Sequence, residues 1–168
     1  MSTKFVVGDV VVYASHGIGT IESTRSAGSE SGTITVCFES GLTVTLPVAR
    51  AREALRPLSS EADLDDVQHS LRTVVDQSAE PWSRRHRRTR EKLTSGTVTE
   101  LAEVVRDGLQ REQAAATRGG GTTAPSDRQL YLQARGLLVA EIALCRGIEP
   151  ADAEAWIHEQ VGDRVSSS

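Results

Sequence analysis

A basic run that follows a tryptophan contains the residues whose types and spacing could do chemistry. The stretch EPWSRRHRRTREKLTSG occupies residues 80–96, and it places six arginine and lysine side chains and one glutamate between residues 82 and 92. The whole chain has 168 residues and a net charge of −4, so its positive charge is concentrated in this run. Guanidinium and ammonium groups bind phosphates, and an apolar ring flanked by cations can wedge between base pairs. We therefore expect an anion-binding site with an exposed indole at its edge.

The same stretch has the pattern of a helix. Pro81 suits a helix start because it lacks a backbone N–H, and Gly96 suits the position after a helix end. A helix from about residue 82 to residue 93 would spread positive charge over a broad arc of its surface. Cations one turn apart repel each other, and cations near a helix N-terminus oppose the helix dipole. A phosphate backbone would relieve both penalties.

Two plainer interpretations of these residues stay open. The basic run could be a solvated helix face that only aids solubility, and Trp82 could fill the core of a helical domain. The run is positive although the chain is acidic, and it places cations near a helix N-terminus, where they are unfavourable. Both features favour a role in ligand binding. For the second tryptophan, Trp156, we predict a core position, because it sits between Ala155 and Ile157 in an amphipathic pattern.

Other kinds of site find no support in the sequence. There is no P-loop and no G-x-S-x-G motif, so we expect no enzymatic activity. The two cysteines lie far apart, and neither C-x-x-C nor H-x-x-x-H occurs, so we expect no disulfide framework, metal site, cofactor or small-molecule ligand. No apolar stretch approaches the roughly 18–20 residues that span a bilayer, and no signal peptide is evident. We therefore expect a cytoplasmic protein with no membrane partner.

Two halves with different periodicity must position the basic run. In residues 1–57, four or five short β-type runs are separated by glycine and serine turns, which predicts a small, strongly bent sheet or barrel. Two sets of apolar residues are each expected on one strand face, namely Ile34, Val36 and Phe38, and Leu42, Val44 and Leu46.

After Pro57 the apolar residues recur at helical spacing. We predict helices within the stretches 58–77, 82–93, 95–116, 126–147 and 149–161. Two capping boxes are expected, Thr97 with Glu100 and Ser126 with Gln129. The predicted class is α+β with two domains: a small β-barrel at 1–57, a linker at 58–63, an all-α domain at 64–165 and a frayed tail at 166–168.

Several of these stretches resemble the CarD family of bacterial RNA polymerase-binding transcription regulators, also called CdnL. The opening FVVGDVVVYASHGIGTIE, the strand GLTVTLPV and the later helix ARGLLVAEIAL are similar to motifs of that family. The basic run is the closest match, with its Trp-Ser-Arg-Arg core, its Lys-Leu-x-Ser-Gly helix end and the Ala-Glu-Val-Val-Arg-Asp stretch that follows. The resemblance covers most of residues 4–147.

The resemblance implies a fold and a function. The N-terminal module would be Tudor-like or SH3-like and would bind the β subunit of RNA polymerase. The helical module would contact promoter DNA at the upstream edge of the transcription bubble, where a tryptophan wedges into the minor groove and basic residues hold phosphates. Such contacts would stabilise the open complex. Carried onto this sequence, the DNA-binding residues are Trp82, Arg84, Arg85, Arg87 and Arg88.

The same resemblance implies the polymerase-binding residues. Thr45, flanked by Val44 and Leu46, stands where well-known members have an arginine, and Arg25 is the expected match of a second arginine that contacts polymerase. His86 also departs from the family, which often has tyrosine there. We expect a monomer, since one copy on one polymerase site is the simpler arrangement. We also expect polymerase to deliver it to the promoter, because the acidic remainder of the chain weakens free DNA binding.

Two other functions fit parts of the sequence. A protein-interaction adaptor would use the β module on another partner without a direct DNA role, and both the acidic surface and Thr45 permit it. A stand-alone sequence-specific DNA reader fits less well, because no clear helix-turn-helix is present. A tryptophan with arginines would sense phosphates and DNA deformability rather than a base code.

Overall fold

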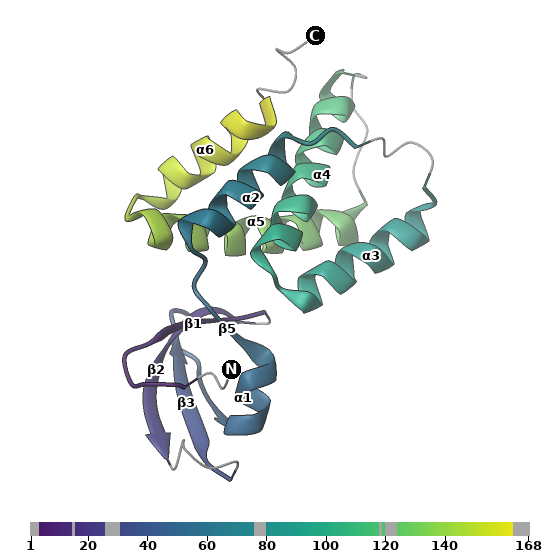
Figure 1. Cartoon of the computed structure of the whole chain (residues 1–168). Coiled ribbons are helices and arrows are strands. Elements are labelled where there is room, and N and C mark those ends of the chain that lie inside the picture. Colours follow the sequence, from purple (N-terminus) through teal and green to yellow (C-terminus); the bar gives the residue numbers. More distant parts are fainter. Residues whose placement is uncertain are drawn as a thin grey trace. The chain divides into compact units, whose positions relative to one another are not determined.

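The computed structural model describes residues 4–14, 16–25, 31–75, 80–117, 119 and 124–162 (Figure 1). The chain divides into two compact units, Met1–Leu58 and Ser59–Ser168. The first unit contains an antiparallel sheet with one short helix, and the second contains helices. The predicted α+β class is confirmed.

The first unit is built on five antiparallel strands. They are β1 (Val10–Tyr13), β2 (Gly17–Arg25), β3 (Thr33–Phe38), β4 (Thr43–Pro47) and β5 (Leu55–Pro57), arranged in the order β4-β3-β2-β1-β5. The register between β2 and β3 shifts between Ile21 and Ser23, which marks a bulge that increases the local twist. Gly19 pairs with Phe38, and a Cβ at this glycine would lie 2.8 Å from the Phe38 ring. The missing side chain therefore lets the two strands pack over the core.

Alternation along the strands builds the core of the first unit. Ile34, Val36 and Phe38 are buried, which confirms the face predicted for them. The sequence pattern missed a helix, α1 (Val48–Ala54), which adds Val48 and Ala51 to the same core. The prediction that Leu42 shares a strand face with Val44 and Leu46 is wrong, because Leu42 precedes β4 and is exposed, whereas the other two are half-buried.

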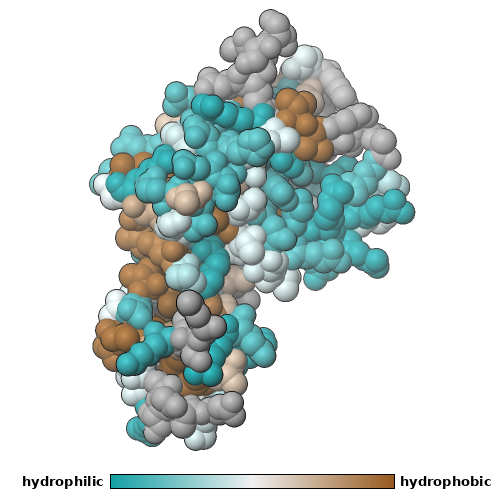
Figure 2. All heavy atoms as spheres, viewed as in Figure 1, coloured by the Kyte–Doolittle hydropathy of each residue, from teal (hydrophilic) through white to brown (hydrophobic). Residues whose placement is uncertain are grey.

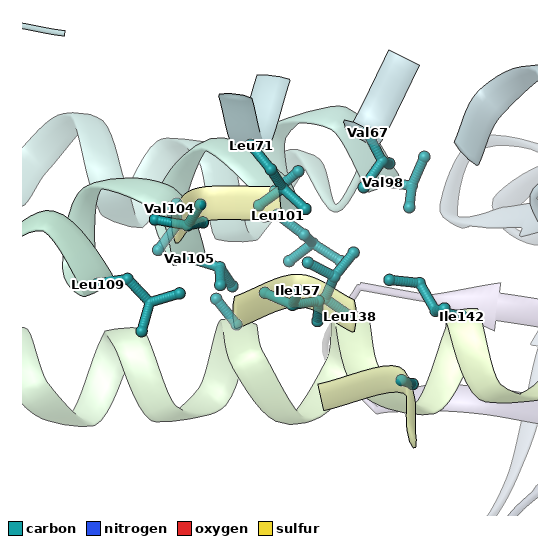
Figure 3. Packing of buried hydrophobic residues seen from close by; sticks show 14 of the residues in the cluster. Val67, Leu71, Val98, Leu101, Val104, Val105, Leu109, Leu138, Ile142 and Ile157 are labelled. Atoms are coloured by element: carbon teal, nitrogen blue, oxygen red, sulfur yellow. The ribbon is translucent and has the colours of Figure 1, made fainter. Parts of the chain in front are cut away.

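The second unit contains the helices α2 (Glu61–Arg72), α3 (Trp82–Ser95), α4 (Val98–Thr117), α5 (Pro125–Arg146) and α6 (Pro150–Gly162). They confirm the five predicted helices, with small differences at the ends. Side chains of α4, α5 and α6 meet in its core, as Figure 3 shows for Leu101, Leu138 and Ile157. Within the described residues, no helix combines the length and the apolar character needed to cross a bilayer.

The ends of α3, α4 and α5 test the predicted helix signals. Gly96 caps α3 in the left-handed region at φ 69°, as predicted. The backbone N–H of Glu100 donates to Thr97 Oγ1 at 3.3 Å, which agrees with the predicted cap of α4. The box predicted for Ser126 and Gln129 is wrong, because α5 begins one residue before Ser126 and has no side-chain cap. A proline at the first helical position fixes that start instead.

Candidate nucleic-acid interface

The helix α3 carries the basic run and exposes most of its surface. Pro81 occupies the N-cap position without a side-chain cap, and Leu93 is the one buried residue of the helix. The visible surface over α3 is mainly hydrophilic (Figure 2). A helix with so little apolar burial depends on polar contacts to fix its place against its neighbours.

Trp82 begins α3, and its side chain is 48% exposed. Its Nε1–H donates to Asp127 Oδ2 at 2.9 Å. Its ring stacks on the His86 ring, with 5.0 Å between the centroids and 21° between the planes. The indole is therefore held at one edge and on one face while much of its surface meets solvent. The alternative that Trp82 fills the helical core is excluded.

Asp127, near the start of α5, is the buried anion behind the tryptophan. The carboxylate is 5% exposed, and it also contacts Arg85 Nη2 at 3.3 Å and His86 Nδ1 at 2.8 Å. Burial alone would raise the pKa of Asp127. The hydrogen bonds from His86, Arg85 and Trp82, with the nearby charge of Arg111, outweigh burial and hold that pKa below its ordinary value. Asp127 is therefore ionised at neutral pH.

Three basic residues of α3 are paired with carboxylates of the protein itself. The pairs are Arg85 with Asp127 at 3.3 Å, Arg88 with Glu80 at 2.6 Å, and Lys92 with Glu103 at 2.7 Å. Arg88 uses both terminal nitrogens, because Nη1 also donates to the second Glu80 oxygen at 2.8 Å. The repulsion expected along the basic run is thus relieved partly by carboxylates of the same unit.

The other three arginines, Arg84, Arg87 and Arg90, are exposed and make no ion pair among the described residues. Two of them line an open groove of about 460 Å³ along α3, whose lining residues are Ser83, His86, Arg87, Arg90, Glu91 and Thr94. His86 belongs both to this groove and to the stack on Trp82. The groove and the exposed indole therefore form one continuous surface. The guanidinium groups and the Ser83 hydroxyl on this surface can bind phosphate oxygens.

The structure divides the five predicted DNA-binding residues into two groups. Trp82 is exposed, and so are Arg84 and Arg87, which make no ion pair among the described residues, whereas half-buried Arg85 and exposed Arg88 hold carboxylates of the same unit. The sequence reasoning did not assign Arg90 to the site, although it lies three residues after Arg87 on the same helix face. It also gave no role to His86 or Asp127.

The predicted polymerase-binding residues of the first unit lie on two faces of its sheet. Thr45 is exposed, and its Oγ1 lies 3.0 Å from Thr35 Oγ1 across the β3–β4 pair. Arg25 is exposed at the end of β2, two residues along from the position opposite Thr35. Val44 and Leu46 are half-buried and pack against the core. Thr45 therefore points away from the face that Val44 and Leu46 turn toward the core, and the role of these residues in polymerase binding stays a prediction.

Comparison with known proteins identifies both units. The family model described as "CarD, C-terminal domain" matches residues 66–158, and the one described as "CarD-like/TRCF RID domain" matches residues 5–59. A relative from Bacillus subtilis (strain 168), "Putative transcription factor YdeB", is 25% identical over 149 residues, which cover 86% of this chain and 94% of that protein.

These matches define a two-part transcription regulator of the class that interacts with RNA polymerase, and not an enzyme class. The chain belongs to the CarD family. The resemblance drawn from the basic run and the flanking strands is confirmed.

Proposed function

We propose that the first unit binds the β subunit of RNA polymerase and that α3 contacts promoter DNA at the upstream edge of the transcription bubble. Trp82 enters the minor groove there, and Arg84 and Arg87 hold the adjacent phosphates. The result is a longer-lived open complex. Such a role places the protein in the cytoplasm, as a monomer on polymerase.

The observation that carries this proposal is the half-exposed indole at the front of a helix on which Arg84 and Arg87 are exposed and make no ion pair with any described residue. An aromatic ring of this size normally becomes buried unless it has a partner, since exposing it forfeits the gain from removing apolar surface from water. Arg84 and Arg87 follow it by two and five residues. An apolar wedge flanked by cations is how minor-groove proteins open a base step.

The match of residues 5–59 supports docking of the first unit on polymerase. Thr45 lies in β4, which forms one edge of the sheet, and an edge strand can pair with a strand of a partner. A threonine here lacks the charge of the arginine found in well-known members, so the contact relies more on backbone pairing and on Arg25.

Docking makes a weak DNA contact useful. The net charge of −4 opposes free association with DNA, whereas a docked protein presents α3 at a high effective concentration. A wedge that fits distorted DNA better than regular duplex shifts the equilibrium toward the distorted, open state.

Site-specific photo-crosslinking tests the proposal. A photoreactive amino acid replaces Trp82 in the full chain, and a second variant carries it in place of Trp156. In complexes of polymerase with promoter DNA, we expect the first variant to crosslink to DNA just upstream of the bubble and the second to give no DNA adduct. Retention on polymerase without any DNA adduct from position 82 would overturn the DNA role.

The adaptor function is the second candidate, and one observation favours it. Arg85 and Arg88 are engaged within the unit, which leaves fewer cations for DNA than the sequence suggests. An adaptor would crosslink from position 82 to protein rather than to DNA. The same experiment therefore separates the two functions.

A further inference from the structure

We infer that Asp127 is a positioning residue that holds the Trp82 indole in a fixed orientation for its partner. This inference rests on the proposed function, since it assigns to Asp127 and His86 the task of presenting the wedge. Neither residue belongs to the basic positions that resemble the family motif, and His86 stands where that motif often has tyrosine.

The geometry supplies two constraints on one ring, and Asp127 contributes to both. Asp127 accepts a hydrogen bond from the Nε1 edge at 2.9 Å, and His86 covers one face at a centroid distance of 5.0 Å. The hydrogen bond opposes rotation of the ring within its own plane, and the stack opposes tilting out of that plane. The 48% of the side chain that stays exposed must then come from the opposite face and the far edge of the ring.

The Asp127 carboxylate contacts three side chains of the first turn of α3. Its two oxygens contact Trp82, Arg85 and His86, which lie at spacings i, i+3 and i+4 on one helix face. Pro81 provides no side-chain cap for this helix start, and a negative charge beside a helix N-terminus interacts favourably with the helix dipole. Asp127 lies on α5, so it ties the orientation of the indole to the rigid packing of the second unit.

The surroundings show why the carboxylate is hard to replace. Among the described residues, the buried Nε atoms of Arg85 and Arg111 have no hydrogen-bond partner. Both guanidinium groups lie in the field of Asp127, and Asp107 also acts on Arg111. Without Asp127 the positive charge of Arg85 and Arg111 near the start of α3 would be less well compensated. Trp82 would then lose its edge contact, and His86 would lose the bond that orients its ring.

A fixed ring binds better than a mobile one. A side chain that is already ordered does not lose rotamer freedom on binding, and that saving corresponds to about a twofold to tenfold gain in affinity. Positioning by Asp127 should therefore increase the contribution of Trp82 to binding beyond what a mobile indole would give.

Exchange of the indole proton in the free, full-length protein tests the contact itself. With nitrogen-15-labelled tryptophan the chain gives two indole N–H signals, and Trp82→Phe assigns them. We expect Asp127→Ala to speed water exchange at the Trp82 indole about tenfold or more and to leave Trp156 unchanged. Unchanged exchange at Trp82 in a folded variant would overturn the inference.

A double-mutant cycle on open-complex lifetime tests the functional consequence. Asp127→Asn, which keeps the shape and one oxygen acceptor, should shorten the lifetime about twofold to tenfold when Trp82 is present and should have no effect in a Trp82→Ala background. Asp152→Asn, an exposed carboxylate in the first turn of α6, serves as the matched control and should change neither readout.

The outcomes separate the two levels of the account. An effect of Asp127→Asn that is equal with and without Trp82 would overturn the positioning role and leave the proposed function standing. If Trp82→Ala itself left the lifetime unchanged, the proposed function would fail with the functional part of this inference, and the indole exchange would still decide whether Asp127 fixes the ring.

Discussion

The two tryptophans of the chain lie in opposite environments of the same unit. Trp82 is half-exposed at the start of α3, and its edge meets a buried carboxylate. Trp156 packs against the hydrophobic core, and the Arg146 guanidinium lies 4.5 Å from its ring centroid. The core position predicted for Trp156 is confirmed in part, because its ring is only half-buried. Trp156 contributes packing to its own unit, whereas Trp82 is ordered but left available to another molecule.

Truncating each tryptophan should give the largest contrast in stability. Trp156→Ala removes core contacts and should lower the free energy of unfolding by about 2–3 kcal/mol, near the lower end for buried aromatic residues because the ring is partly exposed. Trp82→Ala should cost less than about 1 kcal/mol, since Asp127 keeps Arg85 and His86. Urea unfolding of both variants measures the difference. Equal losses would show that Trp82 is a packing residue after all.

The Asp127 carboxylate, which lies behind Trp82, should make the free energy of unfolding depend on pH. The pKa of Asp127 is lower in the folded chain than its ordinary value, so its contribution is present above about pH 4 and disappears as the pH falls through the folded pKa. Asp127→Asn should therefore be less stable than the wild type by about 1–2 kcal/mol at pH 7, and this gap should close below pH 4.

Urea unfolding of both proteins between pH 7 and pH 3 measures this gap. The groups that face Asp127 are His86, Arg85, Trp82 and Arg111. A gap that stays constant with pH would contradict the ionised state of Asp127.

Adjacent arginines allow a matched test of which cations bind DNA. Arg87 lines the groove without an ion pair among the described residues, whereas Arg88 is bound to Glu80 through both terminal nitrogens. Arg87→Gln should weaken DNA engagement in the polymerase complex about threefold and reduce the slope of log affinity against log salt by about 0.9. Arg88→Gln makes the same change in charge but should have a smaller effect. Salt titrations of promoter binding compare the two, and the reverse order would show that the Glu80 pair opens on DNA.

The smallest expected effect on stability concerns the contact between Arg146 and the Trp156 ring. Arg146→Gln removes the cation above Trp156 and should cost about 0.5–1 kcal/mol of stability without altering promoter binding. Urea unfolding and promoter binding are measured on the same preparation. A loss of promoter binding here would extend the DNA-contacting surface to α5 and α6.

Local signals explain how far the sequence alone could lead. The start of α3, its end at Gly96 and the exposure of Trp82 follow from proline, glycine and charge patterns within the run itself. The short helix α1 escaped prediction because its seven residues hold too few turns to show a helical period. The box at Ser126 failed because a proline one residue earlier started α5 instead.

The positioning of the indole could not have been predicted from the run. Asp127 lies 45 residues beyond Trp82, and nothing in its local sequence separates it from an ordinary first-turn acid of a helix. The same limit applies to the pair of Lys92 with Glu103, which brings two helices together. The concentration of positive charge in one run predicts that α3 needs anions nearby. That the protein itself supplies some of these anions follows only from the packing of α3, α4 and α5.

The lifetime of the open complex tests the central claim most directly. Preformed complexes of polymerase, promoter and full-length protein are challenged with a competitor, and their decay is followed for the wild type, Trp82→Ala and Trp156→Phe. We expect the Trp82→Ala variant to stay bound to polymerase. It should shorten the lifetime of the open complex several-fold, which corresponds to a loss of about 1 kcal/mol or more of stabilisation. The Trp156→Phe variant should keep the wild-type lifetime. A wild-type lifetime with Trp82→Ala bound to polymerase would contradict the account.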